Sequence, residues 1–238
     1  MDTRQFATGF NDSHLVLYRR GTLLGNALLD SGNVMMPNTG QPLAGVNLME
    51  IIPQAIAPVM LLKPPRFEDM RGYFTELYSR RAADAQGLGF EFVQDNLSFS
   101  SAVGTVRGLH FQASPSEQTK LVSVVAGAIM DVAVDLRMGS PTYGRHVSAE
   151  LSADNGLQML APRGFAHGFC TLTPNTLVLY KVDAFYDPQR DFGLRWNDPV
   201  LGICWPVSEH DAKLSPKDRD HPLFSELPHY FSYPDGQA

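Results

Sequence analysis

The sequence predicts an all-β sandwich or barrel from residue 50 onward. Short segments rich in β-branched and aromatic residues are separated there by Gly, Pro, Asn and Asp. Between residues 129 and 137, Val132, Val134 and Leu136 alternate with mainly polar residues, which gives one apolar and one polar face. The 238 residues, 44% of them hydrophobic, can bury one sizeable core, and the length permits one domain or two.

Residues 1–48 differ from the rest of the chain. They contain scattered Gly, Asn and Thr with short apolar pieces, and no helical or strand period continues through them. A segment of this kind has little apolar surface to bury, so we expect an N-terminal extension that is peripheral or poorly ordered.

Helix is scarce in the predicted fold. Residues 79–86 contain Ala and Arg and are followed by Gly87, which predicts a short helix with a C-terminal glycine. A second start is predicted at Ser215, the N-cap, with Pro216 at the first helical position. No strand, glycine-rich loop and helix follow one another, so a Rossmann nucleotide site is not expected.

Two tight turns predict β-hairpins. Residues 121–126 and 129–136 flank Gly127-Ala128. Residues 167–172 and 176–182 flank Thr173-Pro-Asn175, and pairing around that turn would bring the region of His167 opposite that of Tyr180. The sequence does not fix whether both side chains share a face.

Charge and cysteine content exclude several classes of protein. A formal charge of −6 and a pI near 5.6 argue against a nucleic-acid binder, which normally has a basic face. No apolar run approaches the roughly 18 residues of a membrane span, and no secretory signal pattern is expected. Cys170 and Cys204 are too few for a disulfide framework and lack metal-site spacing. We therefore expect a cytoplasmic protein with two buried thiols.

The most informative stretch is residues 104–121, which contains Arg107, His110 and Lys120 between Val-rich segments. A general base beside two cations is typical of a site for an anionic substrate with an acidic proton. Each residue alone is as easily a core histidine or a solvated cation. The second stretch, residues 162–169 followed by Tyr180-Lys181, favours the functional interpretation.

Together these stretches resemble the dTDP-4-dehydrorhamnose 3,5-epimerase family, which makes the sugar-nucleotide precursor of L-rhamnose. Nine motifs occur in the family's order over about residues 49–223: Phe67-Glu-Asp-Met-Arg-Gly-Tyr-Phe74 with Glu76, Val93-Gln-Asp-Asn96, Arg107-Gly-Leu-His-Phe-Gln112, Lys120-Leu-Val122, Asp131-Val-Ala-Val-Asp-Leu-Arg137, Ser140-Pro-Thr142, Gly164-Phe-Ala-His-Gly-Phe169, Trp196-Asn-Asp198 and Leu214-Ser-Pro-Lys-Asp218. The resemblance implies a double-sheet jelly roll of the cupin type over residues 49–238.

The resemblance also implies epimerisation at C3 and C5 of dTDP-4-dehydro-6-deoxy-D-glucose, without a cofactor. His110 is then the base, because an imidazole is substantially neutral near pH 7. Asp218 is implied to hold its tautomer and stabilise the imidazolium. Asp218 could instead serve only the helix start, as part of a capping box.

Tyr180 is the implied acid, since a phenol with a pKa near 10 is protonated at neutral pH and can return a proton to an enolate. Lys120 is implied to stabilise the developing oxyanion. The alternatives are a half-buried strand tyrosine and an ordinary strand lysine.

Substrate contacts follow from the same resemblance. Arg71, Arg107 and Lys217 are candidates for the phosphates, and Phe185 for stacking on thymine. The segment that holds Arg71 and Phe74 is implied to reach into a partner subunit's site, which predicts a homodimer. The remaining predicted contacts are Glu76, Gln94, Asp95, Asn96, His167 and Asp191.

The sequence leaves three alternatives to consider: a metal-dependent enzyme, a single-centre epimerase and a non-catalytic binding protein. Metal-dependent cupins typically carry a second His two residues after the first, where this chain has Gln112, so no catalytic metal is expected. A single-centre epimerase acting on a related TDP-4-keto-6-deoxy sugar remains open. A non-catalytic sugar-nucleotide-binding protein is disfavoured, because binding alone does not need a paired base and acid.

Overall fold

The computed structural model describes residues 46–233 and the backbone of residues 6–11, 14–19, 22–30 and 33–34. The chain forms two compact units, one built mainly from residues 1–53 and 64–91, the other from residues 54–63 and 92–236. The predicted boundary after residue 48 lies inside the first unit, and the peripheral role of residues 1–48 stays a prediction. In the part that the structure describes, no helix is long and apolar enough to cross a membrane.

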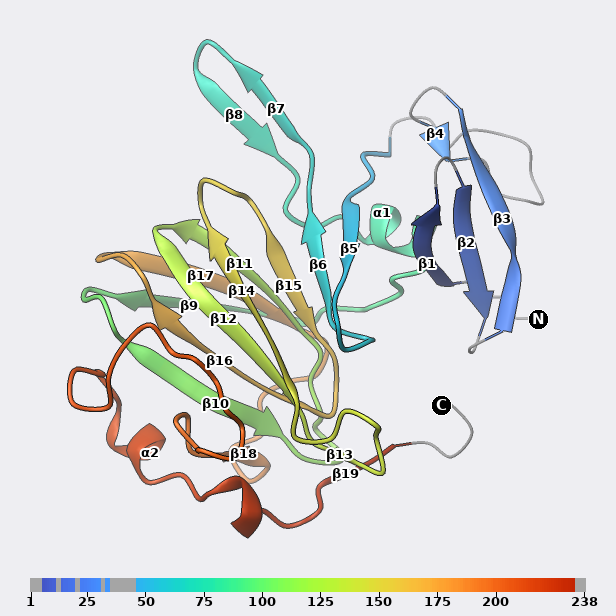
Figure 1. The fold of residues 1–238 in the computed structure, drawn as a ribbon. Helices are drawn as coiled ribbons and strands as arrows, with labels where there is room; N and C mark the ends of the chain where they lie inside the picture. The colour runs from blue at the N-terminus through green and yellow to red at the C-terminus, as the bar shows by residue number, and fades with distance from the viewer. Residues whose placement is uncertain (1–5, 12–13, 20–21, 31–32, 35–45, 234–238) are drawn as a thin grey trace. The chain divides into compact units, whose positions relative to one another are not determined.

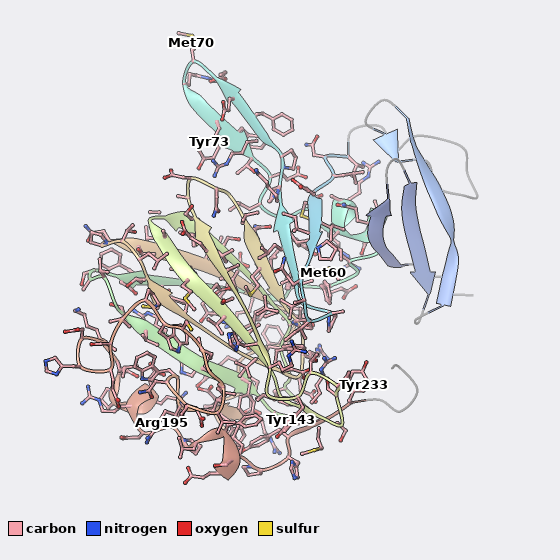
Figure 2. The ribbon with its side chains drawn as sticks, viewed as in Figure 1. Met60, Met70, Tyr73, Tyr143, Arg195 and Tyr233 are labelled. Atoms are coloured by element: carbon pink, nitrogen blue, oxygen red, sulfur yellow. The ribbon has the colours of Figure 1, made fainter. Side chains whose placement is uncertain are left out.

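The first unit contains two antiparallel β-structures and one helix (Figure 1). Its elements are β1 (Phe6–Asn11), β2 (His14–Arg19), β3 (Thr22–Asp30) and β4 (Asn33–Val34), which form one sheet in that order, then β5 (Glu50–Pro53), the hairpin of β7 (Arg66–Asp69) and β8 (Gly72–Thr75), and α1 (Arg80–Ala85). The sequence pattern had predicted no strands among residues 6–34. Met70 lies at the tip of the β7–β8 hairpin, fully exposed (Figure 2).

The predicted helix at residues 79–86 is confirmed as α1. Its N-cap is Ser79, whose hydroxyl oxygen accepts a hydrogen bond from the amide of Ala82. Gly87 follows the C-cap with φ of 75°, the left-handed conformation that commonly ends a helix.

The second unit is a sandwich of two antiparallel sheets, so the predicted double-sheet jelly roll is confirmed. One sheet has the order β14-β12-β16-β10-β18, and five neighbouring strands of the other run β6-β15-β11-β17-β9. The bounds are β6 (Met60–Lys63), β9 (Gln94–Ser100), β10 (Val106–Gln112), β11 (Lys120–Ala126), β12 (Ala128–Asp135), β14 (His146–Ser152), β15 (Gln158–Ala161), β16 (Phe165–Thr171), β17 (Thr176–Val182) and β18 (Asp191–Gly193), followed by α2 (Pro216–Arg219), the 3-10 helix η1 (Phe224–Glu226) and the short pair β13 (Arg137–Met138) with β19 (Phe231–Ser232).

Both hairpin predictions were wrong. Strands β11 and β12 lie in different sheets, as do β16 and β17, so each turn carries the chain from one sheet to the other. The two turns contact each other: Ala128 donates its amide to the hydroxyl of Thr173, and a Cβ at Gly127 would collide with Thr173 and Thr176. A turn sequence specifies that the chain reverses, but it does not specify which strands then share hydrogen bonds.

Alternation along the strands separates the core from the site. Leu109 and Phe111 of β10 pack with Val132 and Val134 of β12, and the C-terminal segment adds Phe231 to the same cluster. The predicted apolar face of β12 is therefore confirmed. The charged residues on the opposite face of β12, Asp131 and Asp135, are buried as well. Each is paired within the fold, Asp131 with His167 and Asp135 with Arg137. The side chains that alternate with Leu109 and Phe111 on β10 face the other way.

Candidate active site

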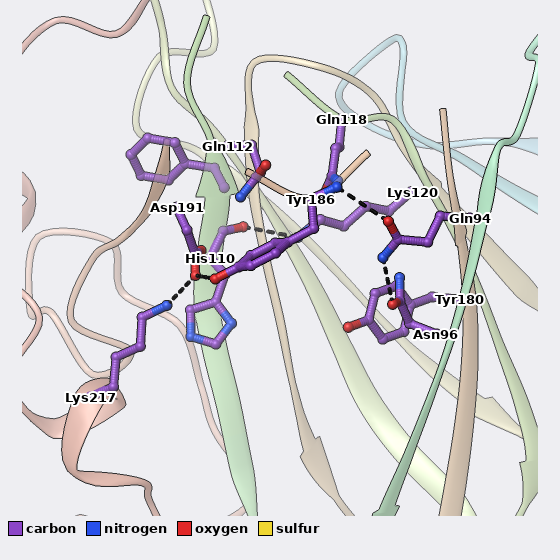
Figure 3. A pocket seen from close by; sticks show the side chains of 11 residues that line it. Gln94, Asn96, His110, Gln112, Gln118, Lys120, Tyr180, Tyr186, Asp191 and Lys217 are labelled. Carbon is purple, nitrogen blue, oxygen red and sulfur yellow. Dashed lines mark hydrogen bonds and ion pairs between the residues drawn. The ribbon is translucent and has the colours of Figure 1, made fainter. Parts of the chain in front are cut away.

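A cavity of about 310 Å³ lies in the second unit, lined from β9, β10, β11, β17, β18, α2 and the loop residues 118 and 186 (Figure 3). Seven of the predicted site residues line it: Gln94, Asn96, His110, Lys120, Tyr180, Asp191 and Lys217. The first and the last of these seven residues are more than 120 positions apart in the sequence. The sandwich brings them together because β10, β11 and β17 are neighbours in or across its two sheets.

His110 and Asp218 form the predicted pair. Nε2 of His110 is hydrogen-bonded to Oδ1 of Asp218, which lies in α2. The other carboxylate oxygen accepts from the hydroxyl of Ser215 at 2.8 Å, while the hydroxyl oxygen of Ser215 accepts from the amide of Asp218 at 3.1 Å. Asp218 therefore belongs to a capped helix start and is also hydrogen-bonded to the histidine, while its role as the partner of a catalytic base stays a prediction.

The protonation states of this pair suit a base and its partner. Burial lowers the pKa of His110 from its ordinary value, and the hydrogen bond with Asp218 opposes that effect only in part. Burial by itself would raise the pKa of Asp218, but hydrogen bonds, that from His110 first among them, hold the pKa well below its usual range. At neutral pH the site thus contains a neutral imidazole beside a carboxylate.

Tyr180 and Lys120 lie on adjacent strands of the other sheet and line the same cavity. Burial raises the pKa of Tyr180, so the phenol keeps its proton at neutral pH. Burial also lowers the pKa of Lys120 to about 8, and its ammonium donates to the carbonyl of His110 at 3.2 Å. A protonated donor and a buried cation therefore face the cavity that the imidazole lines.

A chain of polar contacts runs along one side of the cavity. Oδ2 of Asp191 accepts from the ammonium of Lys217 and, at 2.8 Å, from the hydroxyl of Tyr186. The amide of Tyr186 donates to Gln94 at 3.2 Å, and the side chain of Gln94 donates to Asn96 at 2.8 Å. Burial would raise the pKa of Asp191, but the hydrogen bonds of Lys217 and Tyr186 lower it.

Four predicted contacts of the second unit do not line the cavity. Arg107 donates to the hydroxyl of Ser100 and to the carbonyl of Phe99. His167 is buried and bonded to Asp131 at 2.7 Å. The other two, Asp95 and Phe185, are exposed: Asp95 pairs with Lys181, and the side chain of Phe185 is 71% exposed.

Three further predicted residues, Arg71, Phe74 and Glu76, belong to the first unit. Arg71 pairs with Asp69 of the same hairpin, and Phe74 is exposed. That this hairpin completes the site of a partner subunit stays a prediction.

Four cavity residues were not among the predicted site residues: Phe111, Gln112, Gln118 and Tyr186. Gln112 follows His110 by two positions on β10, so strand alternation could have placed it on the same face. Its side chain exchanges two hydrogen bonds with the backbone of Asp187, at 3.0 and 2.9 Å, and thereby holds the loop that carries Tyr186. Nothing in the pair Phe185-Tyr186 indicates which aromatic ring faces the cavity.

A second histidine, His221, lies beside the pair formed by His110 and Asp218. His221 is buried, and its Nε2 lies 3.7 Å from Oδ1 of Asp218, too far for a hydrogen bond. Among the described residues, His110, Asp218 and His221 form a group whose ligand atoms lie within 4.8 Å of one another, as a metal ion would require.

Comparisons with known proteins agree on one family. The family model described as dTDP-4-dehydrorhamnose 3,5-epimerase matches residues 53–226. A protein of that description from Sinorhizobium fredii is 49% identical over 193 residues, 80% of this chain and 98% of its own. A Bacillus anthracis structure of the same description, with TDP and PPi bound, has a TM-score of 0.71 at 51% identity, over 74% of this chain and 99% of its own. A Legionella pneumophila dTDP-6-deoxy-D-glucose-3,5-epimerase, in complex with dTDP-4-keto-L-rhamnose, has a TM-score of 0.74 at 41% identity, over 78% and 99%.

Proposed function

The chain belongs to the dTDP-4-dehydrorhamnose 3,5-epimerase family, and from that membership and its cavity we propose that it converts dTDP-4-dehydro-6-deoxy-D-glucose to dTDP-4-dehydro-L-rhamnose. The protein is an isomerase of the epimerase type. The observation that carries the proposal is the position of a neutral base, His110, in one cavity with a protonated phenol, Tyr180, and a buried cation, Lys120.

The reaction follows from these groups. The 4-keto group makes the protons on C3 and C5 acidic, and Nδ1 of His110 takes one of them. The electron pair of the broken C–H bond moves onto the keto oxygen as an enolate, and the charge of Lys120 favours that oxyanion. Asp218 stabilises the imidazolium that forms. Tyr180 then donates its proton to the opposite face of the carbon, which inverts the centre, and no cofactor is required.

Binding of the nucleotide is proposed to use the polar side of the cavity. Lys217 offers a cation to the diphosphate, and Gln94 and Asn96 offer amide groups. Tyr186 lines the cavity while Phe185 does not, so we assign stacking on thymine to Tyr186 in place of the predicted Phe185.

The protein is further proposed to act as a homodimer in the cytoplasm. The β7–β8 hairpin exposes Phe67, Met70, Tyr73 and Phe74, an apolar set that a second subunit would cover. Cys170 is buried but Cys204 is exposed, so the expectation of two buried thiols is wrong for Cys204. Both are free thiols, which suits a reducing compartment. Sedimentation velocity tests the dimer, and a monomer at micromolar concentration would refute it.

Incubating the purified protein with the substrate in deuterated water tests the reaction. Deuterium at both C3 and C5 supports the proposal. Deuterium at one carbon only would assign a single-centre epimerase acting on a related TDP-4-keto sugar. Tight binding of the nucleotide sugar without any exchange, in folded protein, would show a binding protein and refute catalysis.

A further inference from the structure

His221 occupies a position that the fold has shaped for an imidazole. A Cβ on Gly193 would lie within 2.7 Å of three atoms of the His221 ring and collide with it, so the ring fits there because residue 193 is glycine. Gly193 is in turn the register partner of His110 on the neighbouring strand. The two imidazoles meet edge to face, with ring centres 5.4 Å apart. The segment after α2 is fixed by the amide of Arg195, which donates to the carbonyl of Pro222 at 2.7 Å.

The buried nitrogen of this ring has no hydrogen-bond partner. Nε2 of His221 is one of few buried side-chain polar atoms in the described part of the chain that lack one, and it lies 3.7 Å from Oδ1 of Asp218. Leaving a buried polar atom unpaired costs free energy, of order 1–3 kcal/mol. The unpaired imidazole of His221 lies beside a second imidazole and a carboxylate. Together these three side chains match the donor set of a metal site.

The spacing of the donors suits a tetrahedral ion. Ligands bound to Zn²⁺ at about 2.0–2.1 Å lie roughly 3.4 Å from one another. Oδ1 of Asp218 and Nε2 of His221 are 3.7 Å apart, so both can bind with little movement. The three ligand atoms lie within 4.8 Å of one another, so His110, which lies close to Asp218, must shift to share the ion. It is the least confined of the three: its side chain is 30% exposed, against 6% and 9% for the other two.

The charges around the group also permit a cation. Asp218 offers a carboxylate oxygen, and His110 and His221 each offer an imidazole nitrogen, ligand types that bind divalent cations. Lys120 and Lys217 are the cations that face the group, and Lys217 is already paired with Asp191. Gln112 occupies the position where metal-dependent cupins carry a histidine, so this cluster is different from their site.

We propose that His110, Asp218 and His221 bind a late first-row divalent cation such as Zn²⁺, and that the bound ion switches catalysis off. The ion displaces the proton from Nε2 of His110, and a neutral imidazole coordinated through Nε2 carries its proton on Nδ1. Nδ1 then has no lone pair with which to take the proton of the substrate. Coordination also removes Asp218 as the partner of the imidazolium. The metal thus acts as an inhibitor of the proposed reaction, which itself needs no metal.

Two independent measurements test this site on the full-length protein. Titration with ZnCl₂ should lower the initial rate of epimerisation, and EDTA should restore it. Titration with CoCl₂, without substrate, should give a visible absorption band of tetrahedral Co²⁺ that added Zn²⁺ abolishes. The Co²⁺ spectrum reports binding whether or not the proposed reaction is correct.

Variants identify the ligands. His221→Gln keeps a polar side chain but loses the imidazole nitrogen, and it should raise the inhibitory Zn²⁺ concentration at least about tenfold. His210→Gln and Cys204→Ser remove exposed alternative ligands and should change nothing. Should His221→Gln fail to fold, His221→Asn serves in its place.

The proposal is overturned by three results. The first is the absence of both inhibition and a tetrahedral Co²⁺ band. The second is equal inhibition of the wild type and the His221 variant. The third is loss of inhibition in His210→Gln or Cys204→Ser, which would place the ion on the surface.

Discussion

Replacing Asp218 by Asn separates the two roles that its position allows. Asn keeps the shape of the side chain and leaves the backbone amide that donates to Ser215 in place. It removes the negative charge that faces Nε2 of His110. The variant should fold normally, because the capping hydrogen bond survives, but its imidazolium should be less stable.

The expected loss of rate follows from the lost interaction. A hydrogen bond to a charged group contributes about 1.5–3 kcal/mol, and a pair of charges about 4 Å apart near a protein surface about 4 kcal/mol. If the imidazolium loses about 2–4 kcal/mol in the transition state, kcat falls by roughly 30- to 1000-fold. KM should change little, since the cavity groups proposed to hold the nucleotide are untouched.

The assay measures kcat, KM and deuterium incorporation for the Asp218→Asn protein beside Ser215→Ala. The Ser215 variant loses the helix cap and should lose about 0.5–2 kcal/mol of stability, with a much smaller loss of rate. An Asp218→Asn enzyme within about threefold of the wild type would refute the role of the carboxylate. Equal losses of rate in the two variants would reduce Asp218 to a capping residue.

Three other predictions concern the same cavity. Tyr180→Phe should abolish net epimerisation while exchange at the first carbon persists, and wild-type product formation would assign the acid to another residue. The pH profile of kcat/KM should be bell-shaped: its acid limb lies below pH 6.5, because His110 must be neutral and burial lowers its pKa, and its alkaline limb lies near pH 8, where Lys120 loses its charge. A rate that stays constant to pH 10 would exclude Lys120 as the required cation. Tyr186→Ala should raise KM severalfold and Phe185→Ala should not, and the reverse order would restore the assignment to Phe185.

The sequence was most informative where a local pattern has a local cause. Ser79 and Ser215 cap the two predicted helices, and alternation on β12 correctly placed Val132 and Val134 in the core. The turn at Gly127 was recognised as a turn, but its strands belong to different sheets. Pairing depends on contacts with strands far along the chain, which no local pattern contains.

The same limit applies to the candidate site. His110, Lys120, Tyr180 and Asp218 were identified through a resemblance, and their meeting in one region follows only from the assembled sandwich. The resemblance indicated Phe185 for stacking, whereas Tyr186 is the residue of this pair that lines the cavity, and local sequence does not distinguish two adjacent aromatic residues in a loop. His221 had no sequence pattern at all: its position depends on the absence of a side chain at Gly193, on another strand.

The base and its carboxylate are separated by 108 residues, and that distance orders events during biosynthesis. Within the two sheets of the sandwich, the last strand, β18, ends at Gly193, so every strand of both sheets has been translated before Asp218. A chain stalled at that stage already contains Lys120 and Tyr180, yet its histidine has no partner. The proposed catalytic pair is therefore complete only when the C-terminal segment docks. Enzymatic activity accordingly reports a finished chain, whereas the β-sheet signal in a spectrum does not.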